Sequence, residues 1–213
     1  LEIGPGKGAL TEYLLKKKPK RLIAIEKDEE LKPFLINIQK RYPDIFKIIF
    51  QDALTYEYSK IKDQKIFLVA NLPYNIATTL VIKWLRHIKK FESIIIMVQR
   101  EVADRLSAEV STKFYGRTSV LVQLHSDVKK IFDVSPDNFY PKPKVNSSII
   151  ELSPKSNLNF NYENIDKLLK ICFAQRRKKL KNNFLKMFMN NCLELFQQFF
   201  YLGKVTAQKF TEN

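Results

Sequence analysis

Short apolar runs alternate with stretches of helical spacing along the first hundred residues of the chain. The runs have the length of buried strands and fall at residues 22–25, 45–50, 66–70 and 93–98. The stretches between them repeat apolar residues at helical spacing and fall at residues 9–14, 28–41 and 77–87, with another helix beginning near residue 99. Strands that alternate with helices in this way predict an α/β protein built on a parallel sheet.

The pattern changes in the second half of the chain. Residues 119–124 and 144–152 alternate as strands and are joined by a proline-bearing segment, so we expect them as antiparallel additions at the edge of a mostly parallel sheet. Composition shifts at residues 153–157, which reads as a linker, and helical spacing follows it. The sequence therefore predicts two domains, with the sheet in residues 1–153 and a small helical domain in residues 154–213.

A glycine-rich turn follows what reads as the end of a first strand. Gly4, Gly6 and Gly8 let the backbone pass close to a ligand, and the helix after them points its N–H groups at the same place. Glu26 closes the next apolar run about 20 residues further on, where a carboxylate can accept hydrogen bonds from ribose hydroxyls. The pattern favours a nucleoside cofactor, with a tight turn and an incidental glutamate as the alternative.

Asp52 and Asn71 also follow apolar runs, at the strand ends where ligands bind in open α/β sheets. After Asn71, which offers an amide oxygen, Pro73 pushes Leu72 toward an extended conformation that can leave the Leu72 carbonyl pointing outward. Tyr74 adds a flat face on which a base can stack. Two acceptors beside a ring predict a pocket for a base with an exocyclic amine, with a simple turn as the alternative.

The charge of the chain indicates a polyanionic partner. Its net charge is +15 and its pI is about 9.7, which suits nucleic acid or an anionic membrane surface. The densest basic run, residues 175–183, falls between two helical stretches, where contact with a phosphate backbone competes with a merely solvated face. No apolar run approaches the roughly 20 residues that span a bilayer, so we expect a soluble, cytoplasmic protein without a membrane partner.

The cysteines and histidines do not predict a metal site. Cys172 and Cys192 lie inside apolar helical patterns and read as core residues of a reducing compartment. His87 and His125 stand apart from any cluster of metal-ligating residues and read as ordinary surface or core histidines.

In the order and spacing of several segments, the sequence resembles the S-adenosylmethionine-dependent rRNA adenine methyltransferases. The segments are residues 1–8, 71–74 and 139–147, together with Glu26 and Asp52. The resemblance covers nearly the whole chain. Residues 99–105, 115–117 and 176–182 look like the small-subunit rRNA adenine dimethyltransferases. Residues 141–148 are equally similar to the large-subunit enzymes that confer macrolide resistance.

The resemblance implies a Rossmann-like class I methyltransferase sheet and transfer of methyl groups from S-adenosylmethionine to the 6-amino group of adenines. The implied substrate is 16S-type rRNA, with two adjacent adenines dimethylated during ribosome biogenesis by a monomer. The implied cofactor-binding residues are Glu2, Gly4, Gly6, Gly8, Glu26, Asp52, Ala53 and Asn71. The implied catalytic group is Asn71, Leu72, Pro73 and Tyr74. The implied RNA contacts, mostly in the helical domain, are Phe139, Arg176, Arg177, Lys178, Lys179 and Lys181.

The ends of the chain depart from the family pattern. The family's basic N-terminal segment with its Gln-x-Phe-Leu motif does not precede Leu1, so we expect residues upstream, and the C-terminal helices stop short. Three alternatives stay open. They are a large-subunit methyltransferase of the macrolide-resistance type, a non-catalytic nucleic-acid-binding factor on the same scaffold, and a nicotinamide-dependent oxidoreductase, which the glycine spacing disfavours.

Overall fold

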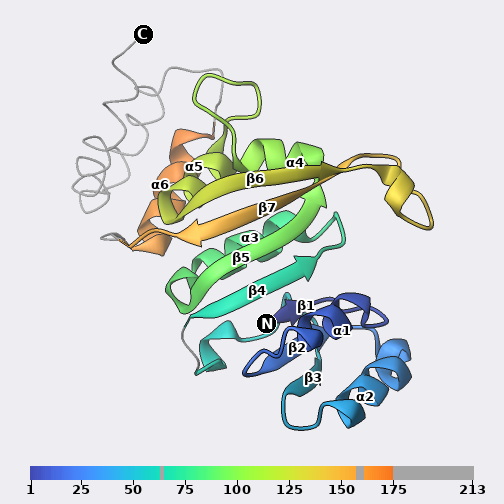
Figure 1. Cartoon of the computed structure of the whole chain (residues 1–213). Coiled ribbons are helices and arrows are strands. Elements are labelled where there is room, and N and C mark those ends of the chain that lie inside the picture. The colour runs from blue at the N-terminus through green and yellow to red at the C-terminus, as the bar shows by residue number, and fades with distance from the viewer. Residues whose placement is uncertain (63–64, 157–160, 175–213) are drawn as a thin grey trace. The chain divides into compact units, whose positions relative to one another are not determined.

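The computed structural model describes residues 1–62, 65–156 and 161–174, which form two compact units (Figure 1). The first unit contains Leu1–Ala103 and Ser126–Pro154, and the second contains Asp104–His125 and the residues from Lys155 onward. Residues 104–125 thus cluster with the helical unit although they precede the last two strands. The division into domains at residues 153 and 154 stays a prediction.

The first unit is built on one sheet with the strand order β3-β2-β1-β4-β5-β7-β6 in the described chain (Figure 1). The strands are β1 (Glu2–Ile3), β2 (Leu22–Glu26), β3 (Phe46–Phe50), β4 (Ile66–Asn71), β5 (Phe91–Gln99), β6 (Ser126–Val134) and β7 (Ser147–Pro154). The strands β1 to β5 run parallel to their neighbours, whereas β7 pairs antiparallel with both β5 and β6. This confirms the predicted α/β class with an antiparallel edge.

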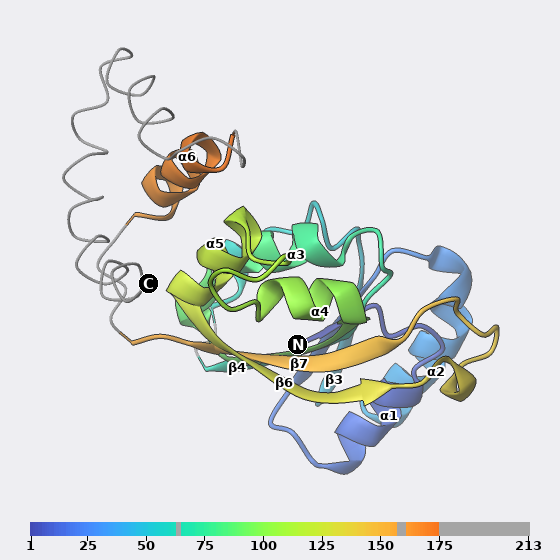
Figure 2. The ribbon, with the colours of Figure 1, turned by 90° about the horizontal axis from the view of Figure 1, so that it is seen from above.

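The helices of the first unit are α1 (Ala9–Lys16), α2 (Lys32–Arg41) and α3 (Ala77–Leu85), and α4 (Arg100–Leu106) crosses from the first unit into the second. Single 3-10 turns occupy Glu29–Leu31, Tyr58–Lys60, Ile88–Lys90 and Pro136–Asn138. Figure 2 shows α3 on one face of the sheet and α1 and α2 on the other. The sheet therefore carries helices on both faces, as is typical of α/β proteins.

The predicted helix from residue 28 is divided into a 3-10 turn and α2. Asp28 is the predicted cap, and its Oδ1 accepts a hydrogen bond from the Glu30 N–H at 2.9 Å. Pro33 has no N–H to donate to the preceding turn, so the α-helical ladder starts only at Lys32. The cluster beneath α1 and α2 includes Leu15, Leu35 and Phe46, which are fully buried.

The predicted strand at residues 119–124 is wrong, because this segment is the helix α5 (Arg117–His125). Ser119, Leu121 and Val122 are all buried, so α5 shows no single apolar stripe and its sequence alternates like a strand. The true partner of β7 is β6, whose charged residues and bulge beyond Lys130 hide its period. The predicted linker also starts too early, since β7 continues to Pro154.

The second unit contains α5 and α6 (Tyr162–Cys172) among its described residues. Ile165, Leu168 and Leu169 are buried, which confirms the helical spacing read from the sequence. His125 is buried against the Tyr162 ring, at 5.4 Å between centroids. Cys172 is half-buried, and burial raises its pKa to about 11. The second predicted helical stretch, Cys192 and the basic run 175–183 lie outside the described residues.

Within the described ranges, no helix is long and apolar enough to cross a bilayer. The same part of the chain holds no group of three or more His, Cys, Asp or Glu side chains placed to bind a metal ion.

Candidate active site

The predicted site residues of the first four strands meet at one edge of the sheet. The residue Ile3 pairs with Ile25 on β2 and with Ala70 on β4, which sets Gly4 beside Glu26 and Asn71. The Gly4 N–H donates to the Ile25 carbonyl at 2.9 Å, and a Cβ on Gly4 would lie 3.7 Å from the Asn71 carbonyl oxygen. The strand order reverses between β1 and β4, and such a reversal opens a ligand-binding crevice in α/β sheets.

The glycine turn has the backbone that only glycine adopts without strain. Gly4, Gly6 and Gly8 have φ angles of 68°, 60° and 92°. At Gly8 the packing is also closed, because a Cβ there would lie 2.2 Å from Cδ1 of Ile38 on α2. The Gly8 carbonyl accepts the Glu12 N–H at 2.9 Å, so the turn leads directly into α1. The turn therefore brings backbone N–H groups and a helix N-terminus to the crevice.

Glu26 ties the glycine turn to the end of β2. Its Oε2 accepts the Gly6 N–H at 3.1 Å, and its Oε1 accepts the N–H groups of Lys27 at 2.8 Å and Asp28 at 3.0 Å. The side chain is 8% exposed. A carboxylate has about four acceptor positions, so Glu26 retains capacity for a ligand hydroxyl.

Glu2 lies beneath the turn and is 1% exposed. Its Oε2 accepts a hydrogen bond from the Thr11 hydroxyl at 2.7 Å, whereas its Oε1 is buried without a hydrogen-bond partner in the described structure. Burial raises the pKa of Glu2 to about 7, against the lowering effect of Thr11. An unpaired buried oxygen is costly, so this carboxyl suits a donor from a cationic ligand. Only the family resemblance pointed to Glu2, because burial is not visible in the sequence.

Asp52 follows β3 and is held in its ionised form. Its Oδ2 lies 2.8 Å from the Lys27 Nζ, and its Oδ1 accepts the Leu54 N–H at 2.8 Å. The Lys27 contact and then the Leu54 N–H lower the pKa of Asp52. The carbonyl of Ala53, the next residue, accepts the Tyr58 hydroxyl at 3.2 Å. Lys27 was missed in the sequence because a lone lysine after a strand carries no signal.

Residues 71–74 connect β4 to α3. Asn71 is exposed at the end of β4, while Leu72 buries its side chain and donates its N–H to the Met97 carbonyl at 3.4 Å. Pro73 is exposed and accepts the Ile76 N–H at 3.2 Å. Tyr74 is half-buried, and its hydroxyl lies 2.9 Å from the Ser147 Oγ on β7. Ser147 is a further residue that the sequence did not single out.

Phe139 lies in the connection between β6 and β7, as predicted, and is half-buried. Ser147 pairs with Gln99 at the carboxyl end of β5, and the Arg100 N–H donates to the Asn146 carbonyl at 3.0 Å. The connection therefore returns to the same sheet edge as Asn71. The predicted RNA contacts Arg176, Arg177, Lys178, Lys179 and Lys181 lie outside the described residues.

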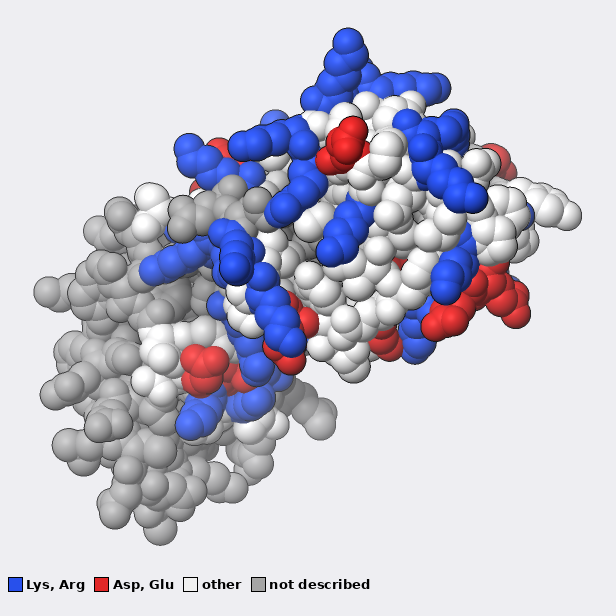
Figure 3. Space-filling view, turned by 90° about the horizontal axis from the view of Figure 1, so that it is seen from below, with Lys and Arg blue, Asp and Glu red and all other residues white. Residues whose placement is uncertain are grey.

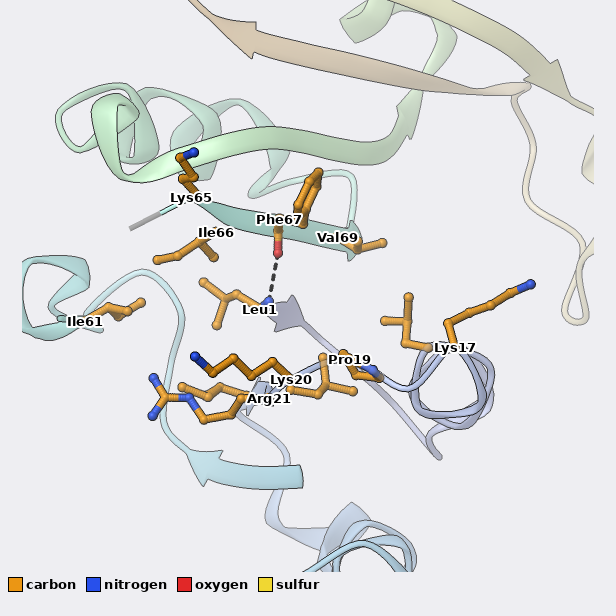
Figure 4. Close-up of a pocket in the computed structure, with 13 residues that line it drawn as sticks. Leu1, Lys17, Pro19, Lys20, Arg21, Ile61, Lys65, Ile66, Phe67 and Val69 are labelled. Atoms are coloured by element: carbon orange, nitrogen blue, oxygen red, sulfur yellow. Dashed lines mark hydrogen bonds between the residues drawn. The ribbon is translucent and has the colours of Figure 1, made fainter. Parts of the chain in front are cut away.

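A pocket of about 630 Å³ opens at the opposite edge, near the amino ends of β1, β2 and β4 (Figure 4). Leu1, Lys20 and Phe67 are among its lining residues, and the Leu1 amino group donates to the Phe67 carbonyl at 2.8 Å. None of the predicted site residues that the structure describes lines this pocket. It is therefore separate from the crevice at the carboxyl ends of the strands.

The sheet and its crevice are those of the class I methyltransferases. A crystal structure of a dimethyladenosine transferase from Plasmodium falciparum matches with a TM-score of 0.77 and 33% identity, covering 95% of this chain and 73% of that one. The 23S rRNA methyltransferase ErmE matches with a TM-score of 0.69 and 22% identity over 87% of this chain and 74% of its own, and shows the fold alone.

The ribosomal RNA adenine dimethylase family matches residues 1–211, and the chain belongs to this family. Ribosomal RNA small subunit methyltransferase A of Pelagibacter ubique is 42% identical over 216 residues, which cover 99% of this chain and 76% of that protein. Its counterpart from Ehrlichia ruminantium is 44% identical over 197 residues, covering 92% and 75%. The family resemblance is thus confirmed, and with it an enzyme that uses S-adenosylmethionine to methylate rRNA adenines.

Proposed function

We propose that this protein transfers methyl groups from S-adenosylmethionine to the 6-amino groups of two adjacent adenines in small-subunit rRNA, acting as a cytoplasmic monomer during ribosome biogenesis. The relatives named for small-subunit rRNA methylation support the substrate. One observation carries the proposal: Asn71 ends β4 directly beside the glycine turn, with its carbonyl oxygen 3.7 Å from the Cβ position of Gly4. The amine acceptor and the cofactor turn are neighbours across the strand reversal.

The cofactor side of the crevice consists of residues on β1, β2 and β3. Backbone groups of Gly4, Gly6 and Gly8 face the methionine portion, and the unpaired Glu2 oxygen suits its ammonium group. Glu26 has acceptor capacity for the ribose hydroxyls, and the Asp52 and Ala53 segment borders the adenine of the cofactor. The residues present therefore fit S-adenosylmethionine.

The substrate side consists of residues 71–74. Bound S-adenosylmethionine supplies a methyl group that its sulfonium already activates, so the protein has to position the adenine amine. Asn71 Oδ1 and the Leu72 carbonyl accept the two amine hydrogens, which favours a pyramidal nitrogen with an available lone pair. Tyr74 stacks on one face of the base and Phe139 closes the other. The methylated nitrogen is acidic, so its proton leaves to solvent without a dedicated base.

The RNA partner is held by cationic side chains. Lys and Arg side chains spread over the face shown in Figure 3, in keeping with the net charge of +15. The densest basic run of the sequence lies outside the described residues, and we assign it to phosphates that flank the target adenines; it holds Arg176, Arg177, Lys178, Lys179 and Lys181. Such contacts anchor the rRNA without reading its sequence.

Replacing the proposed amine acceptor tests the assignment. Asn71→Ala should reduce methyl transfer from labelled S-adenosylmethionine to 30S particles by at least about 100-fold, because one preorganised acceptor is lost. Cofactor binding, followed by calorimetry, should survive the substitution, because the Asn71 atom beside the glycine turn is its main-chain oxygen, which alanine keeps. Full transfer by this variant would contradict the role of Asn71.

The choice of ribosomal subunit is tested separately. Purified 30S and 50S particles are incubated with the protein and labelled cofactor, and the methylated adenines are mapped. We expect label at two adjacent adenines of the small-subunit rRNA. Label in 50S particles alone would support the macrolide-resistance type, and the absence of any turnover would support a non-catalytic factor.

A further inference from the structure

One hydrogen bond joins the substrate loop to the antiparallel edge of the sheet. The Tyr74 hydroxyl lies 2.9 Å from the Ser147 Oγ, although 73 residues separate the two along the chain. Both residues belong to the first unit. Ser147 is fully buried and is the first residue of β7.

The Ser147 hydroxyl is a fixed anchor. Its strand is paired on both sides, with Gln99 of β5 opposite and Val134 of β6 on the other flank. The residue before it is also held, because the Asn146 carbonyl accepts the Arg100 N–H at 3.0 Å. A buried hydroxyl needs a partner, and Tyr74 supplies it.

The Tyr74 ring, in contrast, extends from a loop. It is half-buried and follows the exposed Pro73, so packing covers only part of the ring. A base stacks well only on a ring whose plane is held, since stacking contacts of about 1–3 kcal/mol depend on overlap. The tether at the far end of the ring, on its hydroxyl, restricts that plane.

We propose that Ser147 is a positioning residue for methyl transfer, which holds the Tyr74 ring in the orientation that stacks on the target adenine. The inference rests on the proposed function, in which Tyr74 contacts that adenine. Ser147 also ends the connection that contains Phe139.

The second methyl transfer is the more sensitive step. After the first transfer the adenine amine has lost one of its two hydrogens, so only one acceptor contact to residues 71–72 remains. Stacking then provides a larger share of the orientation. Loosening the Tyr74 ring therefore slows the second transfer more than the first, and monomethylated adenine accumulates.

The test compares two neighbouring serines. Ser147→Ala removes the tether, and Ser148→Ala is the matched control, because Ser148 is equally buried and donates instead to Asp133 Oδ1 at 2.6 Å. We expect Ser147→Ala to lower kcat on 30S particles about 10-fold, to leave the KM for S-adenosylmethionine unchanged, and to raise the ratio of mono- to dimethyladenine. Ser148→Ala should keep the normal kcat and product ratio.

Three further variants separate positioning from folding. Tyr74→Phe removes the other hydroxyl, so the double variant with Ser147→Ala should be no slower than either single variant. Ser147→Thr keeps the hydroxyl and suits a strand, so it should restore both kcat and the product ratio. Additive losses in the double variant, or equal losses in Ser147→Ala and Ser148→Ala with equal falls in Tm, would overturn the inference.

The inference and the proposed function fail in different ways. If Tyr74→Ala loses transfer while Ser147→Ala keeps the normal rate and product ratio, the function stands and the positioning role is wrong. If Tyr74→Ala keeps full transfer, the assignment of Tyr74 to the adenine is wrong, and the role of Ser147 falls with it.

Discussion

At the scale of one residue, Glu2 differs from other buried polar residues of the described chain because one of its carboxylate oxygens lacks a hydrogen-bond partner. Its buried Oε1 has no partner in the described structure, and burial raises its pKa to about 7. The folded protein therefore holds a proton on Glu2 between pH 4.5 and 7, whereas the unfolded chain releases it. Stability falls as pH rises through this window, because the native state binds more protons.

Glu2→Gln should remove that pH dependence. The amide is neutral at every pH, so its buried form costs less than a carboxylate above pH 7. From pH 5 to pH 8, the free energy of unfolding of the variant should rise by about 1–3 kcal/mol relative to that of the unaltered protein. Urea denaturation at the two pH values measures this. Parallel pH profiles for both proteins would show that Glu2 titrates normally.

Gly8 and Gly6 test why the turn needs glycine. Gly8→Ala should destabilise the protein by about 2–4 kcal/mol, because φ is 92° and the new Cβ would meet Ile38 at 2.2 Å. Gly6→Ala is the matched control, with φ of 60° and nothing within 4 Å of the added Cβ, and should cost only about 1–2 kcal/mol. Equal losses in thermal denaturation would mean that the Ile38 contact relaxes freely.

Much of the site at this scale could be predicted from the sequence. Gly4, Glu26, Asp52 and Asn71 follow strands, and parallel strands bring their carboxyl ends together. Lys27 and Ser147 could not be found in this way. Their partners are Asp52 and Tyr74, and those pairs depend on which strands are neighbours, information that periodicity does not contain.

At the scale of elements, α5 and β6 mark the limit of the hydrophobic pattern. The strands β2 to β5 carry nearly continuous apolar runs, as is typical of parallel strands, and are easy to recognise. The helix α5 is buried on several sides and β6 is a charged edge strand, so each lacks the period of its own class. The Gln123 side-chain amide donates to the Leu106 and Ala108 carbonyls, which ties α5 to the end of α4 and the residues after it.

The ion pairs of α6 give a prediction for the second unit. Asp166 is nearly buried, and its Oδ1 pairs with Arg117 on α5 while its Oδ2 lies 2.8 Å from the Lys170 Nζ. Burial raises the pKa of Asp166, but hydrogen bonds from Lys170 and Arg117 outweigh it and lower the pKa overall. The stabilisation is therefore present above pH 4 and is lost as pH falls through the lowered pKa.

Asp166→Asn should destabilise the second unit by about 1–3 kcal/mol at pH 7, because Arg117 loses its charged partner. Hydrogen exchange on α5 and α6 localises the effect. Glu163→Gln serves as the control, since it removes an exposed carboxylate from the same helix. Equal hydrogen-exchange protection of α5 in both variants would contradict the stabilising role of Asp166.

At the scale of the whole molecule, the position of the positive charge should determine how strongly the protein binds RNA. Arg176→Glu with Arg177→Glu should weaken binding to small-subunit rRNA and reduce the slope of log K against log salt by about 1–2, since each lost phosphate contact removes about 0.7. Filter binding at several salt concentrations measures this slope.

A second pair of substitutions separates local contact from net charge. Lys17→Glu with Lys20→Glu makes the same change in charge beside the pocket at the opposite sheet edge. This control should leave the slope nearly unchanged. Equal flattening in both variants would mean that rRNA responds to total charge and that residues 176 and 177 make no particular contact.

The Tyr74–Ser147 hydrogen bond also has a consequence for the order in which the two sides of the site can form during synthesis. The cofactor crevice needs only β1 to β4, but Ser147 reaches Tyr74 only after β7 has inserted between β5 and β6. Pairings between such distant residues form late, because a long loop has to close first. A nascent chain that has emerged only as far as β5 therefore contains the residues of the cofactor side but lacks the strand that anchors Tyr74. The enzyme should therefore become active only when the sheet is complete, and not as soon as residues 71–74 have been synthesised.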